Sequence, residues 1–117
     1  MQTRPMSTIA PEPGGRLIFC TAPADAAPDL ARALLEARLI GCANLIPAVR
    51  SLYWWQGEIQ DDAEVVMLME TPTERVDEAV AALARAHPYE VPKLVVIEPS
   101  AINQPYLEWL RAVTVGA

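Results

Sequence analysis

The chain has 117 residues, of which 52% are hydrophobic, and a formal net charge of −6. This length accommodates one domain with one core. No run approaches the roughly 20 consecutive apolar residues of a membrane-spanning helix, so we expect no membrane partner. The single lysine and the lack of a basic cluster argue against nucleic-acid binding, because phosphate backbones are held by clustered Lys and Arg.

Residues 1–15 contain three prolines and two glycines and no apolar block. We interpret them as a flexible extension in front of one domain over residues 16–117. The segment lacks the apolar region of a signal peptide. We therefore expect a cytoplasmic location, in which Cys20 and Cys42 stay reduced.

The first half of the domain is predicted to form a strand, a helix and a long hairpin. Residues 17–21 are an apolar run of strand-forming residues that ends before Pro23. A helix follows, because apolar residues recur at three- and four-residue spacing, and Gly41 is a plausible end for it. A hairpin is predicted over residues 42–70, with a two-residue turn at Gln56-Gly57 and a bulge or an edge position at Pro47.

The second half is predicted to form a helix, a strand and a final helix. Thr71-Pro72-Thr73-Glu74 matches a capping box with proline at the first helical position, and Pro88 ends that helix. Residues 91–97 are predicted to form the last strand, and a short helix is expected from Gln104 to about Val113.

The order β-α-β-β-α-β with a C-terminal helix predicts the α+β fold class, as a ferredoxin-like sandwich with two helices on one sheet face. The other face then has no cover within one chain. A sheet with apolar residues on both faces and one bare face predicts that the chain oligomerises.

The sequence offers little for catalysis or for a closed metal site. There is no CxxC pair, no HxxxH or HExxH motif, and only one histidine, so a zinc site within one chain is excluded by ligand count. Neither a phosphate-binding glycine loop nor a convergent acid–base pair is present. We therefore expect that the protein is not an enzyme and has no obligatory cofactor.

Five motifs in order resemble the CutA family over about five-sixths of the chain: Phe19-Cys20-Thr21-Ala22-Pro23, Cys42-Ala43-Asn44-Leu45-Ile46-Pro47, Ser51-Leu52-Tyr53-Trp54-Trp55-Gln56-Gly57, His87-Pro88-Tyr89-Glu90-Val91-Pro92 and Tyr106-Leu107-Glu108-Trp109-Leu110. The resemblance implies a homotrimer in which long hairpins reach neighbouring subunits. It also implies a role in tolerance of divalent cations, with copper the metal most often named. Because the architecture resembles that of PII signal-transduction proteins, a regulatory or scaffold trimer with incidental metal binding is the alternative.

The resemblance also suggests Cys20 and His87 as ligands for copper or another divalent metal ion, since thiolate favours Cu(I). The alternatives are a buried cysteine that acts only as a small apolar side chain and a histidine that is hydrogen-bonded at a helix C-terminus. Two ligands are too few for a tight site in a monomer, so a site shared between subunits is the more credible version. Packing is the favoured role of Cys42.

The aromatic residues Tyr53, Trp54 and Trp55 on the hairpin are assigned to trimer contacts. Met67 and Met69 alternate along a strand, point to one sheet face and are expected in the core. The carboxylates that follow the turn are interpreted as a solvated acidic surface: Glu58, Asp61, Asp62 and Glu64.

Two charged positions depart from the pattern that the family usually has. Glu70 stands where a lysine is usual, and Lys93 stands where a glutamate is usual. Because both signs are reversed, we hypothesise that the two positions form an ion pair, within one chain or across subunits. The change also puts in doubt any metal role of that family glutamate.

Overall fold

The computed structural model describes residues 14–117, so most of the extension predicted over residues 1–15 lies outside the described residues. Gly15 is already the first residue of a strand. The elements, in chain order, are β1 (Gly15–Ala22), α1 (Ala27–Glu36), β2 (Cys42–Trp55), β3 (Glu58–Pro72), a 3-10 turn (Thr73–Arg75), α2 (Val76–Ala86), β4 (Val95–Ile97) and α3 (Gln104–Ala112). Within the described residues, every helix is too short or too polar to cross a bilayer.

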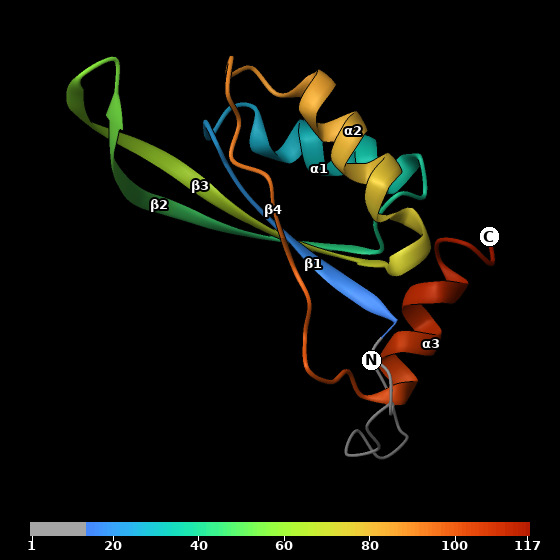
Figure 1. Ribbon diagram of the computed structural model, residues 1–117. Helices are drawn as coiled ribbons and strands as arrows, with labels where there is room; N and C mark the ends of the chain where they lie inside the picture. The colour runs from blue at the N-terminus through green and yellow to red at the C-terminus, as the bar shows by residue number, and fades with distance from the viewer. Residues whose placement is uncertain (1–13) are drawn as a thin grey trace.

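The four strands form one antiparallel sheet in the order β2-β3-β1-β4. This order, with α1 and α2 packed on the same side (Figure 1), is the ferredoxin-like arrangement, and the predicted α+β fold is confirmed. The third helix, α3, lies apart from the other two, at the end of the sheet where β1 begins.

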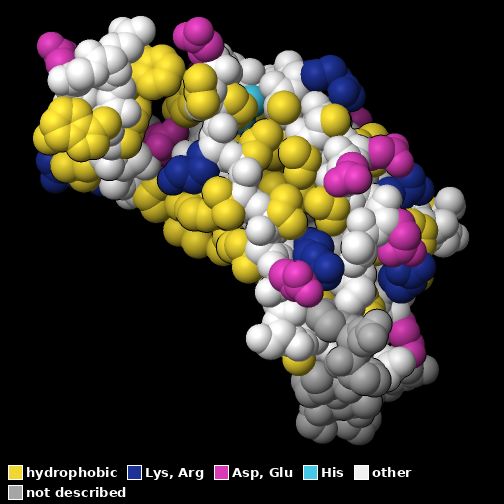
Figure 2. Space-filling view, viewed as in Figure 1, with side chains coloured by type: hydrophobic (Ala, Val, Ile, Leu, Met, Phe, Trp, Pro, Cys, Tyr) yellow, Lys and Arg dark blue, Asp and Glu magenta, His cyan; other side chains and the backbone are white. Residues whose placement is uncertain are grey.

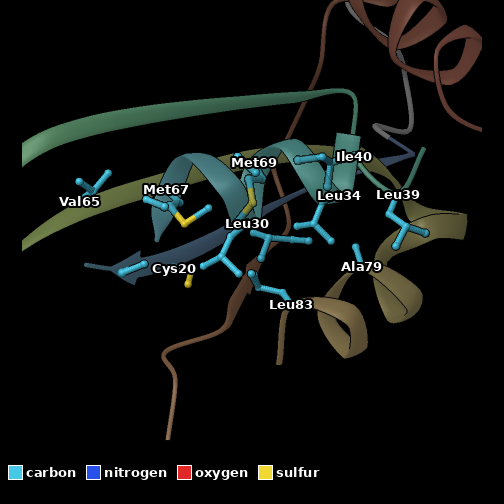
Figure 3. Packing of buried hydrophobic residues seen from close by; sticks show 14 residues of the cluster. Cys20, Leu30, Leu34, Leu39, Ile40, Val65, Met67, Met69, Ala79 and Leu83 are labelled. Atoms are coloured by element: carbon cyan, nitrogen blue, oxygen red, sulfur yellow. The ribbon is translucent and has the colours of Figure 1, made fainter. Parts of the chain in front are cut away.

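The core lies between the sheet and the helices α1 and α2. Alternate residues of β1 and β3 point to this side, and Cys20, Met67 and Met69 are fully buried among leucines of the two helices (Figure 3). Period-two alternation in the strands and three- and four-residue spacing in the helices create the two apolar surfaces that meet here. The methionines are therefore core residues, as predicted.

The hairpin of β2 and β3 extends far beyond the helices (Figure 1). Its turn is formed by Gln56 and Gly57, both at positive φ (50° and 80°), as a two-residue hairpin turn requires. The expected bulge occurs as a register shift between Ile46 and Val49. The radius of gyration is 15.4 Å, compared with about 13 Å for a compact domain of about 100 residues.

Three predicted boundaries were wrong. Thr71 and Pro72 belong to β3, because they pair with Arg16 and Gly15 of β1, and no capping-box hydrogen bond forms. The final strand, β4, covers only Val95–Ile97. Helix α1 ends at Glu36, before Gly41.

Gly41 has a packing role instead of ending the helix. A Cβ atom at this position would lie 2.5 Å from Cδ1 of Leu110, which is closer than two carbon atoms can approach. The missing side chain therefore allows Leu110 of α3 to pack closely against the start of β2.

The sheet face opposite α1 and α2 carries a patch of apolar residues. Cross-strand partners point to the same side of a sheet, and the register places one set together, here called the sheet patch: Leu17, Phe19, Ile46, Val66, Leu68, Val95 and Ile97. All seven side chains are partly or largely exposed. The predicted bare face is therefore present in the single chain.

Candidate functional site

The predicted ligand Cys20 is completely buried, on the sheet face that α1 and α2 cover. Its Sγ donates to the carbonyl oxygen of Thr21 at 3.4 Å. Burial, with a smaller contribution from the negative charge of Glu64, raises the pKa of the Cys20 thiol to about 11. At neutral pH the side chain is therefore a protonated thiol, whereas metals bind the thiolate.

The predicted ligand His87 follows the last residue of α2 and is also buried, with 7% of its surface exposed. The backbone N–H of Tyr89 donates to Nδ1 at 3.1 Å, so the proton of the neutral ring is on Nε2. Nε2 lies 2.8 Å from the carbonyl oxygen of Thr21 and donates to it. Both ring nitrogens are thus occupied by backbone groups.

The structure therefore brings Cys20 and His87 together at one atom, the carbonyl oxygen of Thr21, but not in an arrangement that fits a metal ion. A metal bound there would have to remove the thiol proton and displace one hydrogen bond of the imidazole ring. Within residues 14–117, no group of three or more His, Cys, Asp or Glu side chains gathers closely enough to hold a metal ion. The copper site stays a prediction, and the single chain offers it little support.

Glu64 was wrongly interpreted as part of a solvated acidic surface. It is buried, and its Oε2 accepts a hydrogen bond of 2.6 Å from the hydroxyl of Tyr89. The ring centroids of Tyr89 and His87 are 4.7 Å apart. His87 is hydrogen-bonded to β1 and Tyr89 to β3, so the segment after α2 is fixed to both strands. Tyr89 was named only as part of the His87–Pro92 motif, and nothing in the sequence indicated its contact with Glu64.

The hairpin carries three of the four most exposed large apolar side chains of the described residues. Leu52 and Trp54 lie on one face with Ile59, the cross-strand partner of Trp54, and these three residues form what we call the hairpin patch. Their exposed fractions are 63%, 72% and 62%, and Figure 2 shows hydrophobic side chains gathered at the end of the hairpin.

The other two predicted interface residues lie on the opposite face of the hairpin. Tyr53 is 40% exposed and Trp55 is 37% exposed. The hydroxyl of Tyr53 donates to Asp62. The trimer contacts assigned to Tyr53, Trp54 and Trp55 stay a prediction, for which all three side chains are accessible.

A second polar cluster was not predicted and lies where β2 begins. The hydroxyl of Tyr106 donates to Oε1 of Glu70 at 2.7 Å, and Glu70 is the cross-strand partner of Cys42. Burial and the neighbouring carboxylate of Glu70 raise the pKa values of Tyr106 and Cys42. The spacing of the motifs gave no indication that these side chains meet, because α3 is distant from both strands in sequence.

The hypothesised ion pair of Glu70 and Lys93 is not formed within the described part of the chain. Glu70 is bonded to Tyr106, whereas Nζ of Lys93 lies 5.0 Å from the ring centroid of Phe19. The version in which the two residues meet across subunits stays a prediction.

The sequence of this chain matches a known protein family. The family model described as "CutA1 divalent ion tolerance protein" matches residues 16–113. The divalent-cation tolerance protein CutA of Pectobacterium atrosepticum is 43% identical over 97 residues, which cover 82% of this chain and 88% of that protein. Protein CutA of Homo sapiens is 40% identical over 82% of this chain, and the matched segment is 54% of the human protein's length.

Solved structures give the same result. CutA from Synechococcus elongatus has a TM-score of 0.86 and 33% identity, covering 92% of this chain and 96% of that chain. The divalent cation tolerance protein Cut A1 from Thermus thermophilus has a TM-score of 0.81 and 36% identity, covering 86% and 98%.

Proposed function

Because this chain belongs to the CutA1 divalent ion tolerance family, we propose that it acts in divalent-cation tolerance as a non-catalytic cytoplasmic homotrimer. Its role in this proposal is regulatory or structural, through assembly, and does not depend on a metal ion held by Cys20 and His87. The observation that carries the proposal is the sheet patch, an apolar face that one chain leaves without cover.

Physical chemistry supports assembly through this face. Burying apolar surface contributes about 25 cal/mol per Å², and contiguous exposed apolar patches on soluble proteins mark interaction sites. The hairpin patch adds three more apolar side chains on an arm formed by strands of 14 and 15 residues. A closed ring of identical copies covers every patch equally, which is the usual form of a soluble homo-oligomer.

The test is the molar mass in solution by size-exclusion chromatography with light scattering at micromolar concentration. We expect three chains per particle for the wild type and a loss of the trimer for Leu68→Glu, which places a charge in the sheet patch. Leu35→Glu is the matched control, because Leu35 is exposed on α1, and it is expected to stay trimeric. A folded wild-type monomer contradicts the proposal.

Copper titration of the reduced protein tests the metal part separately. We expect no stoichiometric tight binding that depends on Cys20 and His87. If tight copper binding is lost in both Cys20→Ala and His87→Ala, the copper-binding function predicted from the sequence is favoured and the metal-independent role is contradicted.

A further inference from the structure

The long hairpin leaves the four-stranded sheet at one position of β3. Val65 pairs with Ala22, the last residue of β1, and in the described part of the chain the residues of β3 before Val65 pair only with β2. Residues 49–64 therefore form a two-stranded ribbon, here called the free arm, which projects beyond the helices (Figure 1). A two-stranded hairpin is only marginally stable by itself in water, so the direction of the free arm needs support from elsewhere in the chain.

The bulge of β2 lies at this junction. The register shift between Ile46 and Val49 places Pro47 and Ala48 opposite Val65 alone. An extra residue in one strand bends that strand and increases its local twist. The bulge therefore sets the angle at which the free arm leaves the sheet.

Ala48 is held in an unfavourable backbone conformation at the bulge. Its φ is 61°, a value that is sterically unfavourable for a residue with a Cβ atom. Arg38 and Gln56 also have positive φ, but they lie after the end of α1 and in the hairpin turn, where this conformation is usual. A strained residue persists only where its surroundings hold it, and such residues are often part of a function.

A side-chain contact holds the free arm on the other strand. Glu64, the first residue of the arm next to the sheet, is buried, and its Oε2 accepts a hydrogen bond of 2.6 Å from the hydroxyl of Tyr89. Burial and the carboxylate of Glu64 raise the pKa of Tyr89, so the phenol stays a donor at neutral pH. Because His87 connects the same segment to β1, the contact ties the arm to the sheet across the bulge.

We propose that the bulge at Pro47 and Ala48 and the contact of Tyr89 with Glu64 form one device, which fixes the direction of the free arm within the single chain. The arm carries the hairpin patch, so the device holds this patch in position before another copy is met. An arm that is already ordered loses less conformational freedom on association, and Tyr89 is therefore a positioning residue for assembly. The role in assembly rests on the proposed homotrimer, whereas the fixed direction of the arm does not.

The first test measures the direction of the free arm in single chains by residual dipolar couplings of the backbone amides. The sample is Leu68→Glu, which is expected to be monomeric, or the wild type if that is monomeric. Ile97→Glu, also in the sheet patch, takes the place of Leu68→Glu if that variant does not fold. We expect the amides of the free arm and those of β1, α1 and α2 to fit one alignment tensor. A free arm with averaged couplings that need a tensor of their own overturns the proposal.

Two changes in the same background remove one part of the device each. Tyr89→Phe removes only the hydroxyl, and deletion of Pro47 removes the extra residue, so that Ala48 stands opposite Val65 in a regular ladder. In both variants we expect the couplings of the free arm to leave the common tensor, while those of β1, α1 and α2 stay as in the parent. A free arm that is unchanged in either variant overturns the proposal.

Each change has a matched control. Tyr106→Phe also removes a hydroxyl that donates to a carboxylate, but this carboxylate is Glu70, outside the free arm. Ala48→Gly keeps the bulge, because glycine accepts a positive φ without steric cost. Both controls are expected to keep the arm direction of the parent, and a reorientation of the arm in Tyr106→Phe as large as that in Tyr89→Phe overturns the proposal.

The second test measures assembly of otherwise wild-type chains by light scattering over a dilution series. We expect Tyr89→Phe and the deletion of Pro47 each to raise the concentration of half-dissociation roughly tenfold or more, and Ala48→Gly to leave it unchanged. If the wild type is trimeric and neither change affects this concentration, the role in assembly is contradicted and the trimer is not. If the wild type is a folded monomer, the proposed trimer is contradicted, and the dipolar couplings still decide whether the arm is fixed.

Discussion

Nε2 of His87 lies 2.8 Å from the carbonyl oxygen of Thr21, so the residue that follows α2 is hydrogen-bonded to the end of the central strand β1. The second ring nitrogen accepts from the N–H of Tyr89. The imidazole thus satisfies two backbone groups at once and fixes the connection between α2 and β4. This is a structural role, and it uses both atoms through which a histidine binds metal.

We therefore expect His87→Phe, which keeps a ring but removes both hydrogen bonds, to lower the free energy of unfolding by about 1–3 kcal/mol. The measurement is chemical denaturation at neutral pH and fixed protein concentration. Arg85→Ala, an exposed change on α2, is the control and should alter stability by less than about 0.5 kcal/mol. A variant as stable as wild type contradicts the structural role.

Thr71 makes a second buried contact of this kind. Its side chain is fully buried, and its Oγ1 donates to the carbonyl oxygen of Leu39 at 2.6 Å. Thr71→Val keeps the shape but leaves that carbonyl without its donor, so we expect a loss of about 1–3 kcal/mol in the free energy of unfolding. Thr73→Val, at an exposed position two residues later, should be close to neutral in the same denaturation experiment, and equal losses in the two variants would contradict the prediction.

The parts of the fold that could be predicted are those that depend on residues close to one another in the sequence. The turn at Gln56-Gly57, the bulge after Ile46 and the burial of Met67 and Met69 each follow from a few neighbouring residues and from strand alternation. The start of α2 could not be predicted, because the sequence of Thr71–Glu74 suits a helix cap, whereas pairing of Thr71 with Arg16 extends the strand. Tertiary pairing here outweighs local propensity.

The candidate sites depend even more on contacts between distant residues. Glu64 looked solvated because it follows three exposed acidic positions, but it is buried and accepts a hydrogen bond from Tyr89, 25 residues later. The contact between Tyr106 and Glu70 depends on where α3 packs against the sheet. The sequence of a single strand or helix does not indicate which distant residues it will contact in the fold.

The raised pKa of Cys20 predicts a pH dependence of stability. The thiol keeps its proton up to about pH 11 in the folded chain, whereas an ordinary thiol has a pKa of 9.0. Above pH 9 the unfolded chain therefore releases a proton that the folded chain retains, and the stability contribution that is complete below pH 9 is lost as the pH rises to about 11.

We expect this loss to be about 2 kcal/mol and to be absent in Cys20→Ala, which has no titrating group at that position. The measurement is the free energy of unfolding of both proteins between pH 8 and about pH 11, under reducing conditions and at one protein concentration. Parallel pH profiles for the two proteins would show that the thiol is not desolvated in solution.

The reversed charges of Glu70 and Lys93 lead to the last prediction. Within one chain Glu70 is bonded to Tyr106 and the ammonium group of Lys93 faces Phe19, so the two charges act independently. For chains that are not assembled, a double-mutant cycle with Glu70→Lys, Lys93→Glu and the exchanged pair should then give a coupling energy below about 0.5 kcal/mol. We expect Glu70→Lys alone to be destabilising, because it removes the acceptor of the Tyr106 hydroxyl, and the exchange should not restore that loss. A coupling well above this value, present only at concentrations where copies assemble, would instead place the two side chains against each other across subunits, since no contact inside the chain can supply it.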